Sequence, residues 1–134
     1  MTLLPRQQKG VMKVYRLHLQ LCTHQPDTWR IVEVREDATW QQLHEQIQQL
    51  FGWEDQHPWA LGVEEESVGE GPFDRYPLYS QIGEALSKQR FEACYQYDFP
   101  EYWEVWIRIQ HITLVNTPPL FLLIDSLGES PGEK

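Results

Sequence analysis

Near the start of the chain, hydrophobic and polar residues alternate with the two-residue period of a β-strand. Between Val11 and Cys22, the apolar side comprises Tyr15, Leu17, Leu19 and Leu21, and the polar side comprises Arg16, His18 and Gln20. This alternation is typical of a strand that buries one face. Turn-forming residues at 23–27 precede a second hydrophobic stretch, Trp29–Arg35. We therefore expect these two strands to pair as a hairpin.

After Asp37 the hydrophobic period lengthens from two residues to that of an α-helix. Thr39 followed by Gln42 has the pattern of a capping box, and Asp37 is an alternative cap. The apolar residues at helical spacing are Trp40, Leu43, Ile47, Leu50 and Phe51. Gly52 is well suited to end the helix. The pattern predicts the main helix over about residues 38–51.

The middle of the chain carries weaker signals. A short strand is expected at Trp59–Val63. Residues 64–77 are acidic and contain glycine and proline, so we expect an exposed loop there. The stretch Ser80–Lys88 predicts a short second helix, with Ser80 as its cap.

The second half of the chain has the strongest strand pattern. Phe91–Phe99 alternates along one face and Trp103–Ile109 does the same, with a proline-containing break between them. This arrangement predicts a second hairpin. The apolar stretch Leu120–Ile124 is expected to form a last strand or a strap across the core.

Together these elements predict an α+β fold. We expect an antiparallel or mixed sheet of about five strands, with the main helix at about 38–51 and one short helix packed on it. The length of 134 residues suits one domain over residues 1–134, with flexible tails at about 1–10 and 126–134.

Composition narrows the class of partner and the compartment. The chain has 20 acidic residues against 11 Lys and Arg, a net charge of -9, and such a surface repels phosphate backbones. This argues against a nucleic-acid partner. Cys22 and Cys94 are too few for a disulfide scaffold or a zinc site of their own, and we expect reduced, buried thiols. The absence of a signal-peptide pattern and of a long apolar run favours a cytoplasmic protein without membrane contact.

Several short motifs occur in an order that resembles a known family. They are Tyr15–Leu21 with Trp29-Arg30, Leu43-His44, Phe51-Gly52-Trp53, Asp55 with His57, and Tyr95-x-Tyr97-Asp98-Phe99 with Trp103 close behind. In this order they resemble the Ri-plasmid pRiA ORF-three-like family over roughly Tyr15–Ile109. The resemblance implies a compact α+β fold with helices against a mixed or antiparallel sheet. It also implies frequent carriage on plasmids, phages or insertion elements, and no settled biochemical activity.

The chain departs from the family pattern at two places. Pro100 and Glu101 stand where the family usually has Gly and Asp, and Val105 stands where it usually has His. A role for that second His in metal binding or acid–base chemistry is therefore not expected here. Some relatives carry a resolvase-like label, but a recombinase needs an activated serine and clustered arginines, and this acidic chain offers neither.

An enzymatic interpretation gathers imidazoles and carboxylates. His44, His57 and Asp98 are the candidate catalytic residues, and His44, Asp55 and His57 are the candidate metal ligands. The same side chains fit structural roles at a helix edge, in a loop and at a strand end. We favour the structural roles and expect no metal or other cofactor. Arg30 is likewise expected to hold the fold by pairing with a carboxylate such as Asp98.

Aromatic and acidic residues indicate a binding surface instead. The candidate binding residues are Trp53, Trp59, Tyr102, Trp106, Glu64, Glu65 and Glu66. Tyr102 and Trp106 lie on the strand face opposite the core positions, where they are exposed unless the second helix or the 64–77 loop covers that face.

The leading hypothesis is a non-enzymatic interaction module of a mobile element that binds a protein partner with a basic surface. In one variant, a row of acids mimics a nucleic-acid backbone, and its members are Glu64, Glu65, Glu66, Glu70 and Asp74. The alternatives are a metal-assisted hydrolase that uses His44, His57 and carboxylates, and a nucleic-acid-binding accessory protein that stacks bases on the sheet. The oligomeric state stays open.

Overall fold

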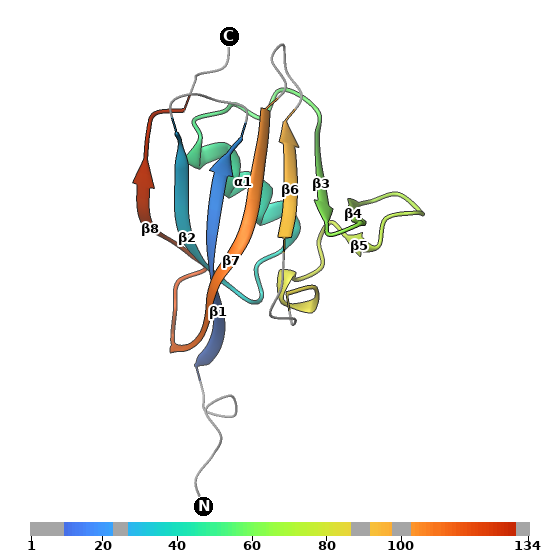
Figure 1. The fold of residues 1–134 in the computed structure, drawn as a ribbon. Helices are drawn as coiled ribbons and strands as arrows, with labels where there is room; N and C mark the ends of the chain where they lie inside the picture. The colour runs from blue at the N-terminus through green and yellow to red at the C-terminus, as the bar shows by residue number, and fades with distance from the viewer. Residues whose placement is uncertain (1–9, 23–26, 87–91, 98–102, 131–134) are drawn as a thin grey trace, which may run out of the picture.

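The computed structural model describes residues 10–22, 27–86, 92–97 and 103–130. In these residues, eight strands form one mixed sheet in the order β5-β4-β3-β6-β7-β1-β2-β8, and α1 lies behind it in the view of Figure 1. The strands are β1 Val11–Leu21, β2 Trp29–Arg35, β3 Trp59–Val63, β4 Glu66–Gly69, β5 Tyr76–Pro77, β6 Glu92–Tyr97, β7 Trp103–Asn116 and β8 Phe121–Leu127. The helical elements are α1 Trp40–Leu50 and the short 3₁₀ turn η2 Ile82–Glu84.

The predicted fold class is wrong in its proportions. Strands hold 54% of the described residues and helices 13%, so the protein is mostly sheet rather than five strands with two helices. Two of the additional strands lie in the predicted loop 64–77. There β4 pairs with β3 and buries Val68, and β5 pairs with β4 in parallel. The loop prediction missed them because two short strands leave little periodicity to detect.

The predicted second helix is replaced by η2. Its backbone is engaged elsewhere, since Ile82 N–H donates to the Ala38 carbonyl and Gly83 N–H donates to the Glu36 carbonyl. A Cβ on Gly83 would lie 2.8 Å from the Glu36 carbonyl oxygen, so this close approach requires glycine. These bonds anchor the start of η2 on residues 36–38, and within the described residues the helical element extends only over Ile82–Glu84; residues 87 and 88 of the predicted helix lie outside them.

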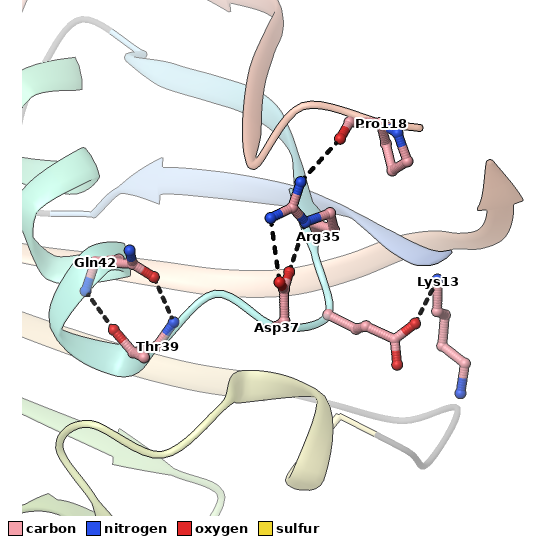
Figure 2. Close-up of polar contacts among 7 residues, drawn as sticks. Lys13, Arg35, Asp37, Thr39, Gln42 and Pro118 are labelled. Atoms are coloured by element: carbon pink, nitrogen blue, oxygen red, sulfur yellow. Dashed lines mark hydrogen bonds and ion pairs between the residues drawn. The ribbon is translucent and has the colours of Figure 1, made fainter. Parts of the chain in front are cut away.

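The start of α1 follows the sequence prediction closely. The Thr39 hydroxyl accepts a hydrogen bond from Gln42 N–H, and the Gln42 side chain accepts one from Thr39 N–H, which completes the capping box (Figure 2). Just before it, the Arg35 guanidinium binds the Asp37 carboxylate and the Pro118 carbonyl. These contacts tie the β2–α1 connection to the segment that leads into β8.

The core lies between α1 and one face of the sheet. Its fully buried side chains come from the predicted alternation and from the helix stripe, and the largest are Trp40, Tyr15, Tyr95, Tyr97, Phe51, Leu17, Leu19, Leu21, Leu43 and Ile47. The opposite face carries the polar side of β1, namely His18 and Gln20, and remains open in Figure 1. In the described chain, no helix has the length and hydrophobicity needed to cross a membrane.

Candidate functional site

The first candidate site is a polar cluster beneath α1 that is buried except for Asp55, whose side chain is 48% exposed. His44 is only 1% exposed, and its two ring nitrogens both form hydrogen bonds. Nδ1 lies 2.7 Å from the Tyr95 hydroxyl, and Nε2 lies 2.9 Å from Asp55 Oδ1. The imidazole also stacks on Trp59, with ring centroids 3.9 Å apart and planes 8° apart. We call His44, Gln48, Asp55 and Tyr95 the histidine cluster.

Hydrogen-bonding chemistry fixes the proton positions in the histidine cluster. An ionised Asp55 only accepts, so Nε2 of His44 carries the proton and donates to it. Nδ1 then accepts from the Tyr95 hydroxyl. The Tyr95 oxygen in turn accepts from Gln48 Nε2 at 2.7 Å, and Gln48 Oε1 accepts from the Asp55 backbone N–H at 2.8 Å. The four residues therefore form a closed ring of satisfied groups.

Burial lowers the pKa of His44 below its ordinary value of 6.5, against the opposing pull of the Asp55 hydrogen bond and charge. The neutral ring matches the proton assignment above. A neutral histidine bonded at both nitrogens has no lone pair to offer a metal. Among the described residues, no three His, Cys, Asp or Glu side chains are grouped to hold a metal ion. The geometry suits a structural role, in which these hydrogen bonds connect α1 to the sheet and to the loop after Gly52.

This pKa shift predicts a pH dependence of stability. Because the pKa of His44 is lower in the folded chain, the unfolded chain binds more protons just below pH 6.5, and stability falls as the pH drops through that range. Urea unfolding at a series of pH values between 7 and 5 measures the slope. His44→Gln, which cannot titrate, should show a shallower slope. A wild-type chain that gains stability relative to this variant on acidification would mean that Asp55 holds a charged imidazolium.

The other predicted aromatic and histidine residues mostly line the core. Trp53, 6% exposed, stacks on Phe51 and Tyr97 with centroid distances of 5.3 and 5.1 Å. His57 meets the edge of the Tyr97 ring at 5.8 Å. Trp59 is half-buried and stacks on the His44 ring. Asp98, Glu101 and Tyr102 lie outside the described residues.

Among the described residues, Arg30 bonds backbone carbonyls rather than a carboxylate, and the predicted partner Asp98 lies outside those residues. Its guanidinium lies over the Phe51 ring at 5.2 Å and donates to the backbone carbonyls of Leu50, Trp29, Leu127 and Gly128. Burial lowers its pKa below the usual value. One side chain thus joins the end of α1 to β2 and to the end of β8. Sequence could not show this, because the acceptors are backbone oxygens.

The second candidate site lies on the open face of the sheet. Trp106 of β7 is 50% exposed, and α1, on the opposite face, leaves it uncovered. The registers place Gln20 and Cys94 beside Trp106, and His18 beside Arg108. A hollow of about 100 Å³ is lined by His18, Gln20, Cys22, Trp106 and Arg108. We call these five residues the β1–β7 hollow.

The strand pattern of the sequence indicated Trp106 but not the other residues of the hollow. The strand alternation had already placed His18 and Gln20 on the polar side of β1, and Arg108 follows Trp106 by two residues on the same face. The alternation along each strand was visible in the sequence, but the register that pairs β1 with β7 was not. The paired strands were expected to be β1 with β2, and β7 with β6, and both of those pairings also form.

Both cysteines lie on the open face rather than in the core, so the prediction of buried thiols is wrong. Cys22 is exposed and Cys94 is half-buried, because each occupies an outward position next to a buried neighbour. Partial burial, with hydrogen bonding to Glu104 and its charge, raises the pKa of Cys94 to about 12. Partial burial also raises the pKa of Cys22. Both thiols therefore remain protonated and weakly nucleophilic at neutral pH.

The predicted acidic residues occupy the turn between β3 and β4 and the loop after it. Glu64, Glu65 and Glu66 are exposed. Asp74 instead accepts a hydrogen bond from Gly71 N–H at 2.8 Å and packs against Gly69, so it belongs to the internal structure of the loop. The exposed members of the predicted acidic row are therefore Glu64, Glu65 and Glu66 at the β3–β4 turn, and Glu70 just after β4.

The architecture defines an open-faced sheet protein with one helical layer. The chain belongs to the plasmid pRiA4b ORF-3-like protein family, whose model matches residues 13–133, so the resemblance seen in the sequence is confirmed. It is 30% identical over 132 residues to the uncharacterized protein y4hQ of Sinorhizobium fredii, with 92% of this chain and 66% of that protein covered. The chain thus spans about two-thirds of that relative.

A solved structure shares the fold. The protein of unknown function MM3350 from Methanosarcina mazei Go1 superposes with a TM-score of 0.79 at 26% identity, over 91% of this chain and 73% of that chain. The names of these relatives state no activity. The family and the solved structure therefore agree with the fold of this chain but assign it no activity.

Proposed function

We propose that the chain is a non-enzymatic protein-interaction module that docks a polypeptide partner on the open face of its sheet. The observation that carries this proposal is Trp106, a half-exposed tryptophan in the middle of that face. Exposed tryptophans flanked by polar side chains are typical of the residues that dominate binding energy at protein interfaces. The histidine cluster supports the same choice, because its imidazole is buried and bonded at both nitrogens and so is poorly placed for catalysis.

Charge favours a partner with basic residues. The exposed acids Glu64, Glu65 and Glu66 lie at the end of β3, and β3 is separated from β7 only by β6. Adjacent strands are about 4.8 Å apart, so the acidic turn and the Trp106 surface lie within the footprint of one partner. The overall charge of -9 adds long-range attraction for a basic protein. We include a cytoplasmic setting in the proposal, since both cysteines are free thiols.

Trp106→Ala is expected to weaken partner binding by at least about 30-fold, the loss of roughly 2 kcal/mol that a central aromatic hot spot gives. The measurement is quantitative capture from extracts of the native host on immobilised chain, followed by titration of the captured protein. Phe73→Ala is the matched control, because Phe73 is an aromatic residue that is 95% exposed in the connection between β4 and β5 and does not line the hollow around Trp106. Equal binding by wild type and Trp106→Ala would refute the proposal. Binding should also weaken with added salt.

A further inference from the structure

Two side chains of the β1–β7 hollow, Gln20 and Trp106, are held in place by neighbours outside it. Gln20 Nε2 donates to Asp27 Oδ1 at 2.7 Å and to the Thr28 carbonyl at 3.2 Å, which fixes the orientation of its amide. Gln20 Oε1 then accepts from His18 Nε2 at 3.0 Å. Trp106 Nε1 donates to Glu104 Oε1 at 2.6 Å, which fixes the indole. His18, Gln20 and Trp106 are therefore preorganised for a ligand.

Two groups in the hollow keep hydrogen-bonding capacity. With Nε2 of His18 donating to Gln20, its Nδ1 faces no partner among the described residues. Arg108 lies directly opposite His18 and takes part in no hydrogen bond or ion pair with any described residue. Glu92 lies opposite Arg108 on β6 and is exposed, so any pairing between the two is screened by water. The guanidinium thus offers its planar fork of donors beside the exposed face of Trp106.

Size and charge decide which ligand the hollow suits. A volume of about 100 Å³ is smaller than the roughly 150 Å³ cavity that holds one benzene, so the hollow admits an end group rather than a whole molecule. One arginine fork matches a single carboxylate. A nucleic-acid backbone needs several phosphates neutralised at once, and a chain of net charge -9 opposes that.

We propose that the β1–β7 hollow binds one carboxylate of a docked polypeptide, with Arg108 and His18 on the carboxylate and Trp106 against the adjoining carbon atoms. The carboxylate belongs to an acidic side chain or to a chain terminus. The inference deepens the proposed function, because it names a group that the docked partner carries next to its basic residues.

The test needs no partner, so it can fail independently of the capture experiment. Backbone amide NMR shifts of the wild-type chain are followed during titration with 3-phenylpropionate, with the neutral 3-phenylpropionamide, and with phenyl phosphate. The expected result is saturable shifts of β1 and β7 amides, with the carboxylate binding about two- to fivefold more tightly than the amide, the range of one solvated ion pair. One short peptide is then titrated in two versions. The version with a succinylated N-terminus and an amidated C-terminus carries only a side-chain-like carboxylate, and the version with a blocked N-terminus and a free C-terminus carries only the terminal carboxylate.

Arg108→Gln should remove the preference for the carboxylate over the amide. Arg75→Gln is the matched control, because it makes the same charge change at an exposed arginine in the connection between β4 and β5 and should leave that preference intact. Equal affinities for carboxylate and amide in the wild-type chain would overturn the inference. Phenyl phosphate binding more than about tenfold tighter than the carboxylate would overturn it in favour of phosphate, and so of nucleic acid.

Discussion

Replacing Tyr95 with phenylalanine is expected to lower the free energy of unfolding by about 2–4 kcal/mol. The substitution keeps the buried ring but removes the oxygen that bonds both His44 and Gln48. Two buried polar groups then lose their partner, and each such loss costs about 1–3 kcal/mol. A domain of this size has only about 5–15 kcal/mol of stability in total. Urea unfolding monitored by tryptophan fluorescence measures the change.

Tyr76→Phe is the control for Tyr95→Phe. It deletes the same hydroxyl from a partly buried tyrosine whose ring contacts Trp40 and Arg75, and whose hydroxyl bonds no described residue. This variant should change the free energy of unfolding by less than about 0.5 kcal/mol. If the two variants were equally stable, the hydrogen bonds of the histidine cluster would not stabilise the fold.

Arg30→Ala is expected to cost about 2–4 kcal/mol of stability, because it removes hydrogen bonds to four carbonyl groups and the packing over Phe51. The loss should concentrate at the end of β8, so amide hydrogen exchange near Leu127 should rise more than at the centre of β1. Thermal unfolding and hydrogen exchange together measure both effects.

Arg16→Ala provides the contrast. Arg16 pairs with Glu33 at 3.0 Å on the open face, with side chains 39% and 21% exposed. An exposed ion pair contributes about 0–1 kcal/mol, so this variant should be close to wild type. A larger loss for Arg16→Ala than for Arg30→Ala would contradict the role assigned to Arg30.

Local sequence signals predicted the elements whose causes are local. The capping box at Thr39, the helix stripe from Trp40 to Leu50 and the alternation of β1 all follow from side chains close together in the chain. Signals failed where tertiary contacts decide the outcome. Ser80–Lys88 has a helical pattern, yet its described part forms only the short turn η2, whose Ile82 and Gly83 N–H groups donate to the carbonyls of residues 38 and 36, contacts that no local pattern reveals.

The candidate sites divide in the same way. His44 and Asp55 were selected by residue type, but Tyr95, which completes the cluster, lies 51 residues beyond His44 along the chain. Its position depends on how β6 lies beneath α1, which the sequence does not specify. Trp106 was found from strand alternation alone. The neighbours that make a hollow of it, His18 and Arg108, required the β1–β7 register.

Site-directed photo-crosslinking shows directly whether the partner docks on the open face of the sheet. A photoreactive benzoylphenylalanine is placed at Gln96, an outward position of β6 opposite Glu104, and separately at Glu45, an exposed position of α1 on the other side of the molecule. Docking on the open face predicts partner adducts from position 96 that Trp106→Ala abolishes, and none from position 45. Adducts from position 45 with none from position 96 would place the partner on the helical layer and contradict docking on the open face.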